Sequence, residues 1–106
     1  MSFLARAAAT ALIGFASGIA LAGAPPAVEI KKFAFAPNEI TVTPGTTVVW
    51  TNQDETPHQI ADNGKTFVST AMDTGDRFEH TFASEGDFAY FCTLHPFMTG
   101  VVHVRK

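Results

Sequence analysis

Cysteine is scarce in this 106-residue chain, which contains only Cys92. A single cysteine excludes an intrachain disulfide framework, a zinc site made of cysteines alone and a cysteine-ligated iron–sulfur cluster. Positive charge is also scarce, because seven lysines and arginines face ten aspartates and glutamates, for a formal net charge of -3. Nucleic acid is therefore not an expected partner, since neutralising phosphates needs clustered positive charge. With 46% apolar and 16% charged residues, the chain has the composition of a folded globular protein, and its length allows one domain at most.

The first 22 residues carry the pattern of an export signal. Residues 1–6 contain one positive charge and no acid, residues 7–21 are uncharged and largely apolar, and Ala20-Leu21-Ala22 offers small residues where a signal peptidase reads them. We therefore predict that residues 1–22 are a secretory signal peptide and that the mature protein is periplasmic. A membrane anchor is disfavoured, because the apolar run is shorter than the roughly 20 residues that a spanning helix needs.

Residues 23–106 form one predicted domain, and that domain is small. A domain of this size buries only about 60–65% of the surface of its unfolded chain and is marginal without further stabilisation. Small exported domains usually obtain that stabilisation from disulfides, which a lone cysteine cannot provide. A bound metal is therefore the expected source of additional stability, and it also accounts for a free thiol in an oxidising compartment.

Apolar and polar residues alternate along the predicted domain, and turn signals recur about every eight to twelve residues, as in a sandwich. Residues 46–52, which are β-branched and aromatic, give the strongest strand signal. No segment sustains a 3.6-residue period, and at most one helical turn fits near residues 70–75. The pattern predicts an all-β protein, a β-sandwich of seven to eight strands. The expected strands are residues 28–35 with a bulge at Lys31-Lys32, 39–42, 46–52, 58–61, 67–68, 77–82, 87–92 and 100–105.

The residues that carry chemistry lie close together, in Cys92-Thr93-Leu94-His95-Pro96-Phe97-Met98. This loop between two expected strands offers a thiolate, an imidazole and a thioether, and a second imidazole, His58, lies upstream. Two histidines, one cysteine and a weakly bound axial methionine form the electron-transfer copper site. The spacing fits such a site: Cys92 ends a strand, the loop turns within two residues to present His95, and after two more residues Met98 returns to the same point.

Each of these residues taken singly has an ordinary structural interpretation, such as a buried cysteine or a core methionine, but their combination favours a metal site. Zinc is the competing metal, although it prefers four firm ligands and a thioether is a poor one for it. No acidic residue lies between Asp87 and Lys106, which disfavours a hydrolytic zinc enzyme. His80 and His103 keep the structural interpretation because they lie in mid-strand, and Met72 is expected at the surface or at the rim of the site.

Several stretches of the sequence together resemble the cupredoxins, the small blue copper proteins with a type 1 site. They are Trp50-Thr51-Asn52, Pro57-His58, residues 86–92 and residues 92–100. The short Cys-x2-His-x2-Met spacing is most similar to that of the amicyanins within this family. The resemblance implies a Greek-key β-sandwich that holds one copper ion, Cu+ or Cu2+, at one end under a surface loop. The copper ligands that it implies are His58, Cys92, His95 and Met98.

The resemblance extends to residues around the ligands. It implies that Asn52 and Thr93 tie the two ligand-bearing loops together. Two positions depart from the family pattern: Gln59 stands where asparagine is common, and Leu94 stands where proline is common. No role of the side chain at position 59 is therefore implied.

The leading functional hypothesis is a soluble, periplasmic one-electron carrier that is not an enzyme. Its expected partners are redox proteins, namely a dehydrogenase, a c-type cytochrome or another periplasmic donor or acceptor, docking near His95, Pro96 and Phe97. No nucleic acid partner and no membrane span of the mature form are expected, and the protein is expected to be a monomer. Asp54 and Glu55 either steer a basic partner to this surface or are solvated loop charges. A periplasmic copper chaperone or storage protein is the alternative function, and a metal-free interaction module is the third.

Overall fold

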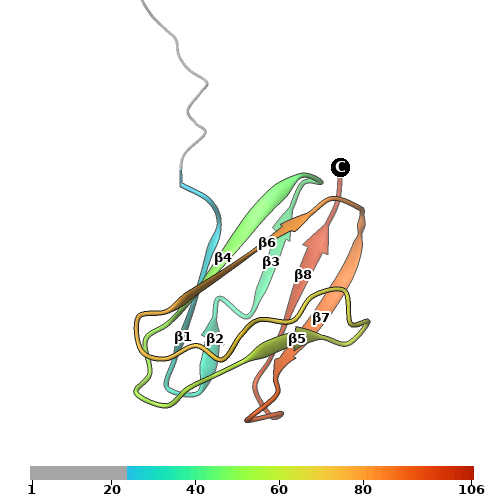
Figure 1. The fold of residues 1–106 in the computed structure, drawn as a ribbon. Helices are drawn as coiled ribbons and strands as arrows, with labels where there is room; N and C mark the ends of the chain where they lie inside the picture. The colour runs from blue at the N-terminus through green and yellow to red at the C-terminus, as the bar shows by residue number, and fades with distance from the viewer. Residues whose placement is uncertain (1–23) are drawn as a thin grey trace, which may run out of the picture.

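The computed structural model describes residues 24–106, which form two four-stranded β-sheets that pack face to face (Figure 1). In spatial order, one sheet contains β2 (Ala34–Ala36), β1 (Ala27–Lys31), β4 (Thr46–Asn52) and β6 (Arg77–Phe82), and the other contains β3 (Glu39–Val42), β8 (Thr99–Val104), β7 (Gly86–Cys92) and β5 (Ile60–Asp62). This architecture confirms the predicted all-β sandwich. The predicted signal peptide, residues 1–22, lies outside the described residues. Within the described residues no helix has the length and apolarity needed to cross a membrane.

The chain changes sheet at every connection from β2 to β7. Strand β1 consequently pairs with β4 in parallel, and β3 pairs with β8 in parallel, while the other strand pairs are antiparallel. Connections that pass between two sheets collect at the ends of a sandwich rather than over its faces. The connection between β4 and β5 and the loop that follows β7 can therefore meet at one end of the molecule.

The core is built from the inward-facing half of each strand and is rich in aromatic rings. On β4, Val48, Trp50 and Asn52 alternate with outward residues and are fully buried, as the period of two requires. The Trp50 ring packs against that of Tyr90 on β7, with centroids 5.4 Å apart at 84°, and burial raises the pKa of Tyr90 to about 12. Gly100 pairs with Tyr90, and a Cβ at this glycine would overlap the phenol ring, so only glycine fits there.

The sequence prediction was wrong in detail for three segments. Residues 28–35 form two antiparallel strands joined by a two-residue turn, Lys32-Phe33, rather than one strand with a bulge. His58 and Val68 each form only an isolated bridge, because their backbones meet single partners and not a continuing strand. Alternation alone does not distinguish a hairpin from a bulged strand when both leave the same side chains on the buried face.

A cluster of charged side chains joins β3, β7 and β8 at the surface. His103 donates through Nε2 to Glu39 (2.6 Å) and through Nδ1 to Asp87 (2.7 Å), and Arg105 also donates to Asp87 (2.7 Å). Hydrogen bonds to Asp87 and then to Glu39 raise the pKa of His103. The bonds from His103 and Arg105 lower the pKa of Asp87. Both ring nitrogens have carboxylate acceptors, so this site favours the imidazolium form.

We predict that the His103→Gln substitution destabilises the protein at pH values below the folded-state pKa of His103 and that this effect disappears at higher pH. A histidine pKa that is raised in the folded state contributes stability that is fully present below the unfolded value of about 6.5 and is lost as pH rises through the folded value. The stability difference between the two proteins, measured by thermal unfolding from about pH 5 to 9, should therefore shrink with rising pH. NMR titration should give His103 a pKa above that of an unfolded histidine. A constant stability difference across this range would contradict the prediction.

Candidate metal centre

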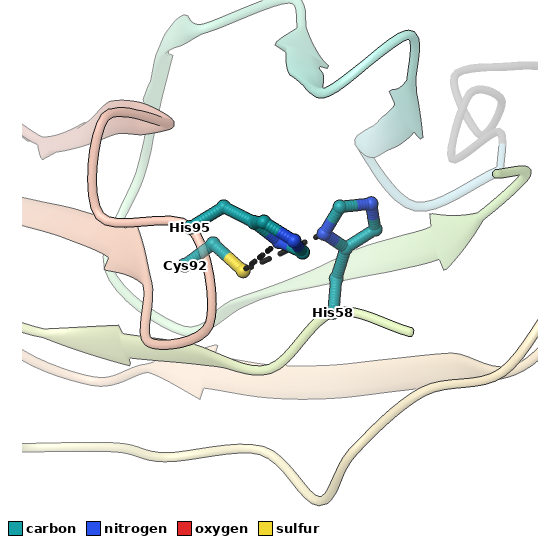
Figure 2. Close-up of side chains that lie close together, drawn as sticks. All are labelled: His58, Cys92 and His95. Carbon is teal, nitrogen blue, oxygen red and sulfur yellow. Dashed lines mark hydrogen bonds between the residues drawn. The ribbon is translucent and has the colours of Figure 1, made fainter. Parts of the chain in front are cut away.

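Three of the predicted ligands converge at one end of the sandwich (Figure 2). The sulfur of Cys92 lies 3.5 Å from Nδ1 of His58 and 3.6 Å from Nδ1 of His95. One donor atom from each of the three residues lies within 4.8 Å of the others. These separations suit three donors that share one ion at metal–ligand lengths of about 2.0–2.3 Å. His58 and Cys92 are fully buried, whereas His95 is half-buried.

Strand register explains why residues far apart in the sequence meet here. Ile60 on β5 pairs with Cys92, the last residue of β7. Side chains two residues apart along an extended chain share a face, so His58 projects from the same face as Ile60 and lies diagonally opposite Cys92. The backbone of His58 also exchanges two hydrogen bonds with Met72, of 2.7 and 3.1 Å. His58 is thus fixed from both sides although it belongs to no strand.

The ligand loop after β7 consists of two consecutive tight turns. The N–H of His95 donates to the carbonyl of Cys92 (3.3 Å), and the N–H of Met98 donates to the carbonyl of His95 (2.9 Å). The N–H of Cys92 donates to the carbonyl of Met98 (3.1 Å) and closes the loop. A turn of this kind spans four residues, so the two intervening residues in each gap are the number that two successive turns require. Met98 is buried within this loop.

The link between the two ligand loops differs from the one expected. Thr93 donates its N–H to the carbonyl of Gln59 (2.7 Å) and its hydroxyl to Oε1 of Gln59 (2.7 Å). The Gln59 amide also donates to the carbonyl of Ser69 (2.9 Å). Asn52 does not take part in this link, because its Nδ2 donates to the carbonyls of Thr56 and Met72. Gln59 thus joins the Cys92 loop to the His58 segment, a role that the sequence did not reveal.

The role of Asp54 in the structure differs from both roles considered in the sequence analysis, a steering charge and a solvated loop charge. Its side chain is only 13% exposed, and its Oδ2 accepts a hydrogen bond from Nε2 of His58 (2.9 Å). Partial desolvation acts to raise the pKa of Asp54, but hydrogen bonds from the N–H of Phe33, from His58 and from the N–H of Lys32 outweigh it and lower the pKa. Asp54 is therefore neither a free steering charge nor a solvated loop charge. Glu55, by contrast, is exposed.

The sequence analysis also assigned positions to His80, His103 and Met72. His80 and His103 lie on β6 and β8 and are not in the metal-ligand group, as predicted. The His80 ring stacks on Phe67 with centroids 4.6 Å apart, and desolvation lowers the pKa of His80. The prediction for Met72 was wrong, because this side chain is only 1% exposed and belongs to the core. It follows a polar, irregular segment, so no periodicity indicated its burial.

Comparisons with known proteins agree with this geometry. The family profile described as copper binding proteins of the plastocyanin/azurin family matches residues 26–105. The chain is 37% identical over 83 residues to the amicyanin of Paracoccus versutus, and the alignment covers 74% of this chain and 63% of that protein. This chain thus spans less than two thirds of that relative's length.

Solved structures show the same fold. A purple cupredoxin from Nitrosopumilus maritimus superposes with a TM-score of 0.70 at 37% identity, covering 76% of this chain and 99% of that chain. A copper-containing nitrite reductase from Thermus scotoductus superposes with a TM-score of 0.74 at 26% identity, covering 78% of this chain and 23% of that chain. The fold therefore occurs both as a small protein and within a larger enzyme.

We predict that Gln59→Ala destabilises the metal-free protein by about 1–3 kcal/mol, because it leaves the Thr93 hydroxyl and the Ser69 carbonyl without their partner in a partly buried position. Urea unfolding measures the difference. Gln53→Ala is the matched control, since Gln53 is exposed and the same truncation there should cost less than about 0.5 kcal/mol. Equal effects of the two substitutions would contradict the assigned role of Gln59.

Proposed function

This chain belongs to the plastocyanin/azurin family of copper-binding proteins, and we propose on that basis that it is a soluble periplasmic one-electron carrier and not an enzyme. The cofactor is one copper ion per chain. The observation that carries the proposal is the meeting of two imidazole nitrogens and one thiol sulfur within 4.8 Å of one another. When bound, copper supplies a one-electron couple between its +1 and +2 states.

We assign the ligands from the donor atoms that are free to bind. His58 offers Nδ1, because its Nε2 is bonded to Asp54, and His95 also directs Nδ1 at the Cys92 sulfur. The thioether of Met98 is assigned as the fourth, weaker ligand. Its support is the closed loop, in which the backbone of Met98 bonds both Cys92 and His95. A thiolate, two imidazoles and a thioether form a set that selects copper over zinc.

The protein around this donor set restrains movement and limits access of water. His58 and Cys92 are completely buried and held by sheet and bridge hydrogen bonds. A restrained donor set rearranges little when the charge at the site changes, which favours rapid electron exchange. Of the three donors only His95 is partly exposed, so we assign it as the point of electron entry and exit.

The surface around His95 is suited to docking of a redox protein. Phe97 is 72% exposed and Leu94 is 51% exposed, beside the exposed Pro96. We name these three residues the His95 rim. Exposed apolar groups that gather at one site mark an interaction surface. The proposed partners are electron donors or acceptors, such as a dehydrogenase or a c-type cytochrome, that cover the His95 rim, and the carrier itself is proposed to be a monomer.

The chaperone alternative lacks structural support. Copper handover favours accessible sulfur ligands, but Met72 and Met98 are 1% and 2% exposed. Cys92 is likewise buried. Among the described residues, no accessible sulfur is therefore available to pass copper to an acceptor.

We predict that the copper-loaded protein has an intense visible absorption band that disappears reversibly on reduction with ascorbate. Cys92→Ser should abolish this band, because the thiolate is the ligand that gives such a site its colour, while His80→Gln should leave it unchanged. Visible absorption and EPR spectra measure the effect. Retention of the band without the sulfur would refute the ligand assignment.

We predict that Phe97→Glu slows electron self-exchange between the reduced and oxidised proteins by an order of magnitude or more, because it places like charges in the contact between two His95 rims. Val68→Glu is the matched control, since Val68 is also apolar and 60% exposed but lies outside the rim. NMR line broadening of mixtures of the two oxidation states gives the rate. Similar rates for both variants would exclude the rim as the contact surface.

A further inference from the structure

The turn between β1 and β2 has a backbone conformation that its sequence does not favour. Lys31 pairs with Ala34, so the loop contains only Lys32 and Phe33. Both residues have positive φ, 54° and 57°, which is the conformation of a type I′ hairpin turn. Such turns favour Asn-Gly or Gly-Gly, and a bulky residue at positive φ is strained. Strain of this kind persists only where surrounding contacts enforce it and is common at functional sites.

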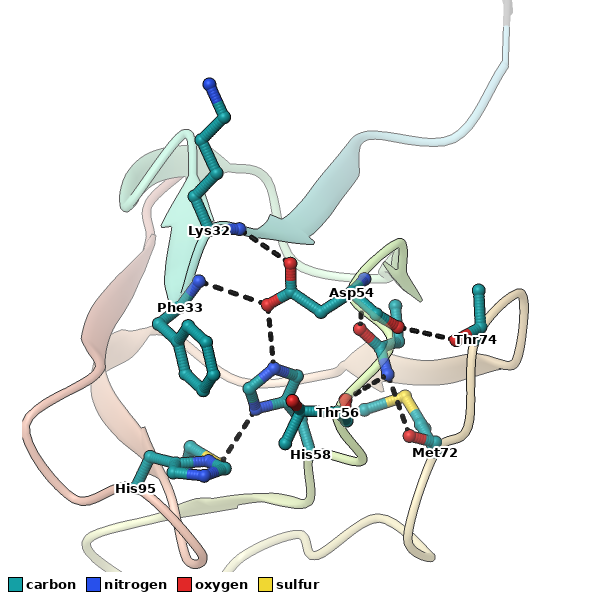
Figure 3. A network of polar contacts seen from close by, with 10 residues as sticks. Lys32, Phe33, Asp54, Thr56, His58, Met72, Thr74 and His95 are labelled. Carbon is teal, nitrogen blue, oxygen red and sulfur yellow. Dashed lines mark hydrogen bonds and ion pairs between the residues drawn. The ribbon is translucent and has the colours of Figure 1, made fainter.

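The contacts that enforce this turn come from Asp54 (Figure 3). Its Oδ1 accepts the N–H of Lys32 (2.6 Å), and its Oδ2 accepts the N–H of Phe33 (3.0 Å). Oδ2 also accepts Nε2–H of His58 (2.9 Å). One carboxylate therefore holds both backbone donors of the turn and one ligand imidazole. In the neutral imidazole, a proton on Nε2 leaves Nδ1 with a free lone pair, so this contact favours the tautomer in which Nδ1 of His58 can bind a metal.

Asp54 is itself held firmly by its neighbours. Its N–H donates to Oδ1 of the buried Asn52 (2.9 Å), and its carbonyl accepts the hydroxyl of Thr74 (2.6 Å). These hydrogen bonds hold the backbone of Asp54 in place, and its carboxylate is therefore held in a fixed position relative to the turn and to His58.

The strained turn places an aromatic ring against both ligand imidazoles. The Phe33 ring lies edge-on to His58, with centroids 5.5 Å apart at 84°, and edge-on to His95, with centroids 5.1 Å apart at 84°. His95 is partly exposed and lies in a loop, so this contact restrains it from the side of the first sheet. Glycine, the residue preferred by the turn, would provide no such ring.

We propose that Asp54 is a positioning residue for both imidazoles of the metal site. It orients His58 directly, and it positions His95 through the Lys32-Phe33 turn, whose strained conformation holds the Phe33 ring against that imidazole. This inference rests on the proposed function, because two of its tests measure copper binding and the reduction potential. The orientation of His58, in contrast, can be measured in the metal-free protein.

The first test compares Asp54→Ala and Asp54→Asn with Glu55→Ala, which removes the neighbouring exposed carboxylate. Titration with Cu2+ against a competing chelator should show a dissociation constant raised about 10- to 100-fold for Asp54→Ala, as is usual when a partner of a metal-bound histidine is lost, and no change for Glu55→Ala. Nitrogen-15 NMR of the metal-free proteins should show the Nε2–H tautomer of His58 in the unsubstituted protein and in Glu55→Ala, and a mixture of tautomers in Asp54→Ala. Asp54→Asn keeps one acceptor oxygen for three donors and should show an intermediate loss in both measurements.

The second test separates the ring from the turn with Phe33→Gly and Phe33→Ala. Both remove the ring, so both should raise the copper dissociation constant by a similar factor, about 2- to 10-fold, and shift the reduction potential. Only glycine relieves the strained turn, so Phe33→Gly should be the more stable of the two in urea unfolding.

The outcomes distinguish this proposal from the proposed function. Unchanged copper affinity and an unchanged His58 tautomer in the Asp54 variants would overturn the positioning role, even if the proteins were less stable. Unchanged copper affinity and potential in both Phe33 variants would overturn the part that concerns His95. If the unsubstituted protein bound no Cu2+, the proposed function would fail, and the tautomer measurement would still decide the role of Asp54 toward His58.

Discussion

The pairing of Ile60 with Cys92 between β5 and β7 is the constraint on which the site depends. Side chains alternate along extended chains, so a slip of one residue in this pairing would turn His58 and Cys92 to opposite faces of the sheet. The core secures this register, since Ile60 and Cys92 are both completely buried and a slip of one residue would turn Ile60 away from the core. The hydrophobic core of a small domain thus determines the geometry of its metal ligands.

The protein holds its ligand segments together without a disulfide by using polar groups that are buried or partly buried. Gln59 and Thr93 join the two ligand loops, and Asn52 bonds the carbonyls of Thr56 and Met72 on either side of His58. A buried polar group is costly unless it is hydrogen-bonded, so each of these residues favours the single arrangement in which its partners are present. These hydrogen bonds therefore favour one arrangement of the ligand segments, while the apolar core provides most of the stability of the fold.

The sequence was sufficient to predict the sandwich, most strand positions and the three donors that converge, because alternation and ligand spacing are local patterns. It was insufficient for features that depend on contacts between distant segments. The turn at Lys32-Phe33 carries no turn-forming residue, because its conformation is enforced by Asp54, which lies 22 residues away from Lys32. Met72 was expected at the surface or at the rim of the site, yet its side chain is 1% exposed and its backbone pairs with that of His58. Gln59 departs from the family pattern, so the resemblance implied no role for its side chain.

The two sides of the site are restrained by different means. His58 is held by a carboxylate and by two backbone hydrogen bonds, deep in the molecule. His95 is held by a short loop of two successive turns and by the edge-on contact with the Phe33 ring. Because this loop is short, no further segment of it folds over the His95 imidazole. The side chains of Leu94 and Phe97 therefore remain exposed. Exposed apolar side chains carry a solvation cost that the core does not relieve. That cost supports the proposal that a partner protein covers the His95 rim.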